Sequence, residues 1–319
     1  MAEKLELTHP WLVAVWPGMG HVALNAGIYL LAKLGMTAFA EYDATELFDI
    51  EQLEVKDGLI QPGRRPRNRF FNWTDPNKRH DLIVFLGEAQ PPAGKYAFCR
   101  HVITFAKNLG VERVFTFAAM ATQMHPSAES RIFGAATDSV NLEELKRLEL
   151  DILKDGHIGG LNGVLLGAAV EAGLQGACLL GEMPHIFAQL PFPKASHAIL
   201  EAFVTLAAID LDLEELAEQA RSVEEQLGEL LAQIEKQRGE PDEEEFEDDE
   251  EGILAEPSAE DEETLPQTVQ PPKQEHIEAL FAQSDQNRSK AFELKQELDR
   301  LGLFKEYEDR FLDLFKKSV

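Results

Sequence analysis

Short apolar runs alternate with helical patterns along residues 11 to 210. The apolar runs predict strands near 11–16, 37–42, 82–87, 113–118, 131–136 and 176–181. Apolar side chains at three-four spacing predict helices near 22–34, 95–109, 140–153, 162–172 and 194–209. Regular alternation of the two patterns is typical of a mainly parallel sheet that helices cover on both faces. The sequence therefore predicts a three-layer α/β/α domain over residues 1–210.

The stretch between Leu53 and Trp73 has a different pattern. Two runs of mixed polarity flank a Pro-Gly turn in VKDGLIQPGRRPRNRFFNW. This pattern favours a β-hairpin or a pair of edge strands. A solvated loop or edge strand is also the interpretation of its four arginines, Arg64, Arg65, Arg67 and Arg69.

Beyond residue 210 the pattern becomes that of an amphipathic helix. Over residues 211–238 apolar side chains recur at three-four spacing, which places them on one narrow stripe. The stripe consists of Leu213, Leu216, Ala220, Val223, Leu227, Leu230 and Ile234. It is typical of a coiled-coil seam, but glutamates flank it. Since like charges repel, we expect the partner of this seam to be a different one.

A second stripe with the same spacing lies in the carboxy-terminal segment, residues 273–319. Its members are Ile277, Leu280, Ser284, Asn287, Ala291, Leu294, Leu298 and Leu301, and a short apolar helix follows Gly302. Two interpretations stay open. These helices dock on the main domain or on each other, or one of them meets a neighbouring subunit or a client protein. The candidate protein contacts are Leu216, Val223, Leu227, Leu230, Leu294, Leu298, Phe304 and Phe311.

Charge is distributed unevenly along the chain. The formal net charge is −27, and residues 239–272 hold 15 acidic and no basic side chains. This segment is predicted to be a disordered linker, because it cannot bury enough surface to offset the entropy of ordering. It would span on the order of 30 Å, so the carboxy-terminal helices could reach another subunit. A chain this acidic repels phosphates and anionic lipids, which argues against nucleic acid and membrane as partners.

Cysteine usage and the amino terminus bear on the compartment. Cys99 and Cys178 lie in separate apolar runs and are expected to be buried free thiols. The first ten residues lack an apolar core of signal-peptide length, and the longest apolar runs are too short to span a membrane. We expect a cytoplasmic protein.

Two glycine-rich turns form the candidate ligand site. The turn at 17–21 follows a predicted strand, and the turn at 159–163 opens a predicted helix. Amides at the amino end of a helix bind anions, and the carboxyl ends of parallel strands share one edge of a sheet. If both turns lie at that edge, they face a common crevice that suits a nucleotide or a phosphate. The candidate residues are Gly18, Gly20, His21, Gly160, Asn162, Gly163 and Glu182.

Both turns lie within longer blocks that resemble the PAC2 (proteasome assembly chaperone 2-like) family. HIGGLNGVLLGAAVEAGLQGACLLGEMP, residues 157–184, resembles the family's G-x-N-G turn, helix, and strand ending in L-L-G-E-x-P. WLVAVWPGMGHVALNAGIYLLAKLGM resembles its first strand, glycine turn and helix. RVFTFAAMATQMHPSAESRIFGAAT resembles its central strand, loop and following strand. The resemblance extends over residues 10 to 210.

The resemblance implies a phosphorylase-like or hydrolase-like α/β/α fold and a binding protein rather than an enzyme. Family members associate with themselves, and eukaryotic and archaeal relatives bind proteasome α-subunits as assembly chaperones or related factors. Relatives that dock into the pockets of the α-ring end in hydrophobic-Tyr-any. This chain ends in Lys317, Ser318 and Val319, so it departs from the motif for that route.

Two alternatives involve a small ligand. Gly18, Gly20 and Ala23 satisfy the dinucleotide fingerprint G-x-G-x-x-A, with Glu41 or Asp43 in the place of the ribose-binding acid. Since the PAC2 family has its own glycine turn at this point, no cofactor is predicted. The broader alternative is an enzyme or sensor that binds a nucleotide-like anion, similar to ATP-grasp ligases or nucleoside phosphorylases. No catalytic residue and no metal ligand is assigned, because the usual motifs are absent.

These observations lead to one expected function. We predict a self-associating, protein-binding factor with a role like that of a proteasome-assembly chaperone. A homo-oligomer is expected, and a proteasome or another protein is the expected client.

Overall fold

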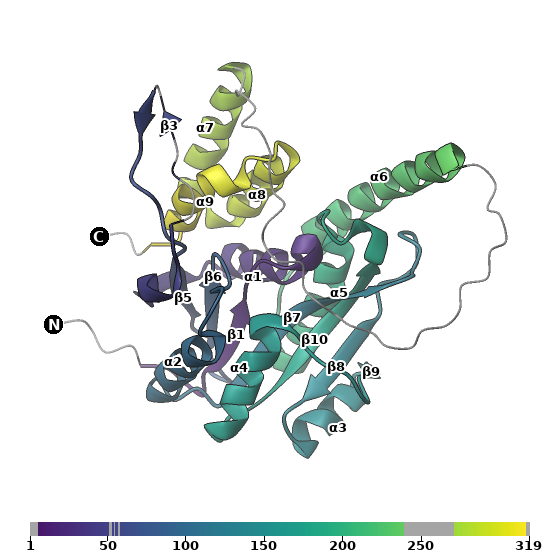
Figure 1. Ribbon diagram of the computed structural model, residues 1–319. Helices are drawn as coiled ribbons and strands as arrows, with labels where there is room; N and C mark the ends of the chain where they lie inside the picture. The colour runs from purple at the N-terminus through teal and green to yellow at the C-terminus, as the bar shows by residue number, and fades with distance from the viewer. Residues whose placement is uncertain (1–5, 51–52, 54, 57, 239–270, 317–319) are drawn as a thin grey trace.

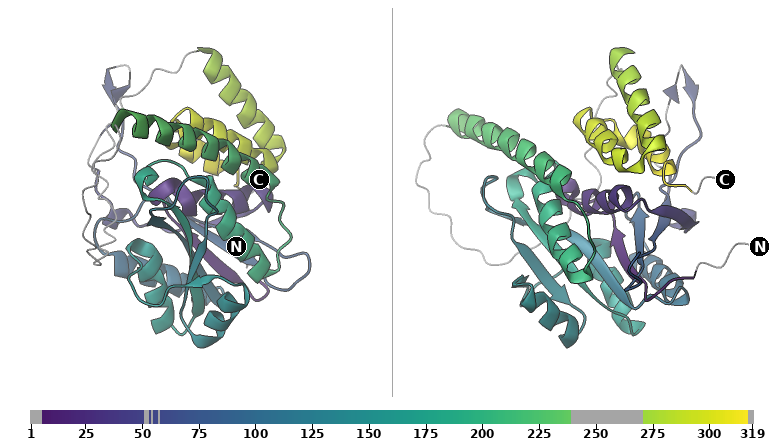
Figure 2. Two further views of the ribbon diagram at one scale, coloured as in Figure 1. Left: turned by 90° about the vertical axis from the view of Figure 1, so that its right-hand side faces the viewer. Right: turned by 180° about the vertical axis from the view of Figure 1, so that it is seen from behind.

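The computed structural model describes residues 6–50, 53, 55–56, 58–238 and 271–316 (Figure 1). Helices cover both faces of a twisted sheet, and a further group of helices lies beyond one face (Figures 1 and 2). The strands are β1 Trp11–Val15, β2 Thr37–Glu41, β3 Val55–Lys56, β4 Leu59–Ile60, β5 Asn68–Trp73, β6 Leu82–Gly87, β7 Arg113–Thr122, β8 Ile132–Ala136, β9 Asp151–Ile152 and β10 Gln175–Pro184. The α-helices are α1 Val22–Lys33, α2 Lys95–Asn108, α3 Ser139–Arg147, α4 Gly160–Glu171, α5 Pro193–Ala207, α6 Glu214–Arg238, α7 Pro271–Gln286, α8 Ala291–Arg300 and α9 Phe304–Asp313. Short 3-10 helices are η1 Met19–His21, η2 Thr45–Leu47, η3 His185–Phe187 and η4 Arg288–Lys290.

The main sheet has the strand order β2-β5-β6-β1-β7-β10-β8-β9. β1 pairs in parallel with β6 and β7, and β7 pairs in parallel with β10. β5 runs antiparallel to β2 and β6, and β8 runs antiparallel to β10. The sheet is therefore mixed but mostly parallel, with helices around it, and the predicted α/β fold is confirmed.

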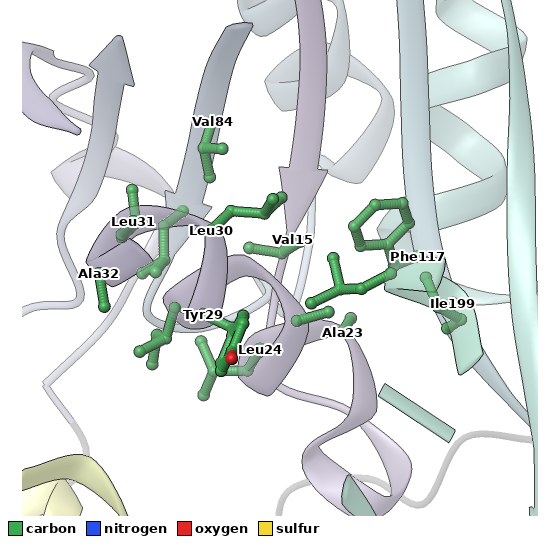
Figure 3. Close-up of a cluster of buried hydrophobic side chains, with 14 of the residues drawn as sticks. Val15, Ala23, Leu24, Tyr29, Leu30, Leu31, Ala32, Val84, Phe117 and Ile199 are labelled. Carbon is green, nitrogen blue, oxygen red and sulfur yellow. The ribbon is translucent and has the colours of Figure 1, made fainter. Parts of the chain in front are cut away.

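Both faces of the central strands are buried, which explains why their sequences are continuous apolar runs. On β1, Val13 and Val15 belong to the core beneath α1 and α5. Leu12 and Ala14 belong to the core beneath α2 and α4. Figure 3 shows the first of these cores, where side chains of α1 meet those of the strands and of α5.

Helix α1 is apolar around its whole circumference because it is buried on two sides. Every residue from Val22 to Ala32 is buried. Its inner side lies close to the sheet, since a Cβ on Gly27 would come within 2.5 Å of Val15. Its outer side is covered by α8, where the ring of Phe292 stands edge-on to Tyr29 with the centroids 4.6 Å apart.

The predicted helix at 140–153 ends early. Helix α3 ends at Arg147, Glu149 takes a positive φ of 59°, and β9 then pairs in parallel with β8. Leu150 and Ile152, which fit a helical stripe, instead pack against the core from this edge of the sheet. Residues 123–131 join β7 to β8 and are too few for the crossover that a parallel connection requires. β8 therefore runs opposite to β7, and it is antiparallel to β10 because β10 is parallel to β7.

The stretch between Leu53 and Trp73 contains a β-hairpin, as predicted, but the turn of the hairpin is not the Pro-Gly turn. The hairpin of β3 and β4 contains Gly58, with φ of 77°, and lies before the Pro-Gly turn. β5 follows and lies between β2 and β6, so it is not an edge strand. The interpretation of solvated arginines is wrong for Arg69, which is buried and ion-paired with α9.

Helix α6 packs on α5 at its beginning, and its far end extends away from the domain (Figures 1 and 2). The predicted disordered linker falls on residues 239–270, outside the described residues, while 271 and 272 begin α7. Cys99 and Cys178 are buried and free, as predicted. In the parts of the chain that the structure describes, no helix has the length and apolar character needed to cross a membrane.

Candidate functional site

The first glycine turn connects β1 to α1. Gly20 has φ of 60°, and a Cβ there would lie 2.8 Å from the side chain of Met183, so both conformation and space require glycine. The amide of Gly20 donates to the carbonyl of Ala188 at 2.8 Å, and the amide of His21 donates to that of Gly18 at 3.0 Å. Two amides of the predicted anion site therefore already have acceptors within the chain.

The second glycine turn begins α4. Gly160 has φ of 62°, a conformation that favours glycine. A Cβ on Gly163 would lie 2.0 Å from the carbonyl oxygen of Ile158, so this turn is closely packed. Asn162 is buried, and its Oδ1 accepts no hydrogen bond from the residues that the structure describes. Substituting Gly163 would thus disturb the turn itself.

Gln90, in the loop after β6, joins the two turns. Its Nε2 donates to the carbonyl of Pro17 at 3.4 Å, and its Oε1 accepts from the amide of Leu161 at 3.0 Å. The two turns therefore lie side by side at the carboxyl edge of the parallel strands. Sequence reasoning missed Gln90. The available signal was its position directly after a strand that ends at this edge.

Glu182, near the end of β10, has partners of its own. Its carboxylate accepts from Arg131 at 2.8 Å and from Thr122 Oγ1 at 2.8 Å. The hydrogen bond from Arg131 lowers the pKa of Glu182 below its usual value. Glu182 lines a cavity of about 590 Å³ with Thr122, Gln123, Met124, Ala128, Glu129 and Arg131, which includes no residue of either glycine turn. This cavity is therefore not the crevice that was expected between Glu182 and the two glycine turns.

The dinucleotide fingerprint does not fit the strand order. The ribose-binding acid of that fingerprint follows the strand next to the glycine turn. Here β5 and β6 separate β2 from β1. Glu41 is ion-paired with Arg67 at 2.6 Å, and the carboxylate of Asp43 accepts from the amide of Thr45 at 3.0 Å. Among the described residues, no group of three or more His, Cys, Asp or Glu side chains is placed to hold a metal ion.

An exposed hairpin gathers apolar side chains at the surface. This apolar hairpin, defined by Leu53, Val55, Leu59 and Ile60, extends away from the main sheet (Figure 1). Val55, Leu59 and Ile60 are 63%, 68% and 70% exposed. Its base is fixed by close packing, since a Cβ on Gly63 would come within 2.5 Å of Ile50. Sequence reasoning assigned no binding role to these residues.

The predicted seam of α6 is used in part within the chain. Leu216 and Leu227 are buried in the core beneath α5, and Val223 is half-buried against it. The amine of Lys194 on α5 also pairs with Glu224 at 2.8 Å. Leu230, one turn further on, is 37% exposed. The first half of the stripe thus docks on the domain, while contact with another protein stays a prediction for the second half.

The carboxy-terminal helices fold back onto the domain. This cassette, residues 271–316, covers α1 and the β2 edge of the sheet, which we call the seat (Figures 1 and 2). Leu294, Leu298 and Phe311 are fully buried, and the ring of half-buried Phe304 packs against Phe311 with centroids 5.5 Å apart. Of the two open interpretations, the structure has the helices docked on their own chain.

An arginine cluster fastens α9 to the domain. Arg64, Arg67 and Arg69 approach the carboxylate of Asp309 to 2.5, 3.2 and 2.5 Å. Burial alone would raise the pKa of Asp309, but the hydrogen bond from Arg64 and the charges of the cluster hold it below its usual value. The cassette is therefore held by charge as well as by apolar burial.

A buried carboxylate lies beneath this cluster. Glu88, at the end of β6, accepts from Arg64 at 2.6 Å and from the amide of Arg67 at 3.0 Å. Burial, and next the charge of Glu308 on α9, raises the pKa of Glu88 to about 6. The junction between the domain and α9 therefore contains a group that titrates near neutral pH.

The fold and its sites define a class of protein: a layered α/β domain with two glycine turns joined at one sheet edge. The family model that matches this architecture is that of the PAC2 family, over residues 12–231. The chain belongs to the PAC2 family.

Individual relatives match about seven-tenths of this chain. The uncharacterized protein MJ1210 of Methanocaldococcus jannaschii is 28% identical over 222 residues, which are 69% of this chain and 82% of that protein. The structure of Pyrococcus furiosus PbaA, an archaeal homolog of proteasome-assembly chaperone, has a TM-score of 0.57 and 26% identity, covering 73% of this chain and 92% of PbaA. That of Pyrococcus furiosus PbaB, an archaeal proteasome activator, has a TM-score of 0.61 and 24% identity, covering 72% and 96%. At that identity PbaB supports the fold alone.

Proposed function

We propose that the protein is a self-associating factor that binds other proteins, with a role like that of a proteasome-assembly chaperone. The observation that carries the proposal is the apolar hairpin. Monomeric proteins seldom expose several large apolar side chains side by side, and such patches mark protein contacts. Val55 and Ile60 pair across the two strands and share one face, Leu59 lies on the other face, and each is more than 60% exposed on an element that leaves the domain.

A member of the family suggests which kind of protein this surface binds. PbaA is named as a homolog of proteasome-assembly chaperone, and the match covers 92% of PbaA and 73% of this chain. We do not extend the proposal to a nucleotide enzyme, because the amides of Gly20, His21 and Leu161 already donate to acceptors within the chain. Binding a second protein, and binding a copy of itself, are both consistent with an apolar hairpin.

Substituting a charge into the hairpin tests the proposal. We expect Ile60→Asp to weaken self-association and the binding of recombinant archaeal proteasome α-subunits at least about tenfold, because a buried charge at an interface costs more than about 1.4 kcal/mol. Light scattering on a sizing column and native mass spectrometry measure the two effects on the full chain.

The matched control is Val140→Asp on α3, a side chain that is 61% exposed at the other end of the molecule (Figure 1). It should leave both measurements unchanged. A wild-type chain that stays monomeric at every concentration and ignores α-subunits would refute the proposed function.

A further inference from the structure

The helices of the cassette pack on one another as well as on the domain, whose core they share. The apolar side chains of the cassette pack among themselves across α7, α8 and α9, where the rings of Phe281 and Tyr307 lie 5.8 Å apart and those of Phe311 and Phe315 lie 5.8 Å apart. The guanidinium of Arg310 on α9 donates to Glu278 on α7 at 2.5 Å. The shape of the cassette thus depends on contacts within it, so it can move as one unit.

The seat recognises the cassette by a defined set of contacts. The amine of Lys295 donates to Asn25 Oδ1 at 2.8 Å in the buried centre. At the sheet edge, the amide of Ala38 donates to the carbonyl of Phe315 at 2.7 Å, and Ala38 bridges in parallel to Lys316. An apolar helix pair therefore docks in the middle, and a short strand contact docks at the edge.

Charge complementarity adds specificity to this contact. The domain contributes basic groups, Arg64, Arg67 and Arg69, and the cassette contributes acidic ones, Asp309 and Asp313. The partner that fits the seat is consequently an aromatic helical unit with carboxylates on α9. A second copy of this chain carries that unit without any change.

The covalent connection leaves the choice of seat open. Outside the described residues, the 32 residues 239–270 join α6 to α7, and a chain of that length reaches at most about 110 Å. The far end of α6 extends away from the cassette (Figures 1 and 2). A neighbour's seat offers identical contacts, so the balance between the two depends on the tether and on how close the neighbour is. A tether of this kind gives an effective concentration on the order of millimolar or below, which a neighbour held in an assembly can match.

We propose that the cassette is exchanged between copies: in the self-associated protein, the cassette of one protomer occupies the seat of its neighbour. This inference rests on the self-association in the proposed function. It makes the seat an interaction surface whose partner is a second copy of this chain. It also gives the carboxy-terminal cassette, which lies beyond the matched residues 12–231, a role in assembly.

Two full-length chains, each with one introduced cysteine, test the exchange. One carries Ala38→Cys and the other Lys316→Cys, positions that face each other across the bridge at a spacing that suits a disulfide. The native Cys99 and Cys178 do not interfere, since both are buried and burial raises their thiol pKa to about 12. After equal mixing and gentle oxidation, exchange at random links about half of the seats that carry Ala38→Cys to a Lys316→Cys chain, giving a disulfide-bonded dimer on a non-reducing gel.

The double variant, Ala38→Cys with Lys316→Cys, serves as the folding control and the second measurement. Exchange predicts disulfide-linked chains from it, whereas a cassette that stays on its own domain closes a ring within the monomer. An assembled native mass with no mixed dimer, and ring closure in the double variant, would overturn the exchange and leave the proposed function standing. A monomeric native mass with ring closure would overturn the exchange together with the self-association on which it rests.

Discussion

The β7–β10 pair and the seat of the cassette are two interfaces of one chain that differ in the interactions that hold them together. The first is a continuous ladder of ten paired positions with an apolar centre, where Phe115, Phe117, Ala177 and Leu179 are fully buried. The second combines buried apolar side chains of the cassette with ion pairs between the arginine cluster and Asp309. Salt does not screen the burial of apolar surface, while it does screen partly exposed ion pairs. The sheet should therefore open last and the cassette first.

In the sheet, the largest loss of stability is expected from a substitution at Gly176. A Cβ there would lie 1.7 Å from the carbonyl oxygen of Val114, and backbone cannot move aside as a side chain can. We expect Gly176→Ala to destabilise the domain by more than about 4 kcal/mol or to prevent folding. Urea unfolding measures the effect.

Gly167→Ala is the matched control, because Gly167 lies in α4 with no heavy atom within 4 Å of the Cβ position. It should stabilise the helix by about 0.5–1 kcal/mol. Equal midpoints for the two variants would contradict the close packing of β7 against β10.

In the cassette, a smaller loss of stability is expected from a substitution at Asp309. We expect Asp309→Asn to lower the free energy of cassette opening by about 1–3 kcal/mol, since three arginines lose a charged acceptor. Faster proteolysis within the cassette, with little change in the sheet, is the expected result. The effect should shrink in high salt. Glu306→Gln removes an exposed charge from the same helix, and a loss of the same size there would point to net charge instead of the specific pairs.

The smallest effect concerns pH and Glu88. Its pKa is raised to about 6 in the folded chain from about 4.5, so folding favours its protonated form. Its contribution to stability is fully present below about pH 4.5 and is lost as pH rises through about 6. The pKa of Asp309 is lowered, so its contribution is lost only as pH falls through still lower values.

The cassette should consequently hold more firmly at pH 5.5 than at pH 7.5, by about 0.8 kcal/mol. Hydrogen exchange of α9 at the two pH values checks this. Glu88→Gln should remove the pH-dependent difference, and an unchanged difference in that variant would assign it to other groups.

The same contrast explains what the sequence could predict. The central strands and α1 follow from continuous apolar runs, because a strand buried on both faces leaves a local signal. The position of β5 inside the sheet and the pairing of Arg69 with Asp309 could not be predicted, since residues 240 positions apart meet there. That the two glycine turns lie at one edge was only a condition of the predicted ligand site, and Gln90, which joins them, carries no local pattern.

The measurement that tests the comparison most directly is hydrogen exchange on the full chain, read by mass spectrometry. We predict that the amides of α8 and α9 exchange through an opening of clearly lower free energy than those of β7 and β10, and that added salt widens the gap. Equal protection of the two regions, unaffected by salt, would contradict the account of a sheet held by burial and a cassette held in part by charge.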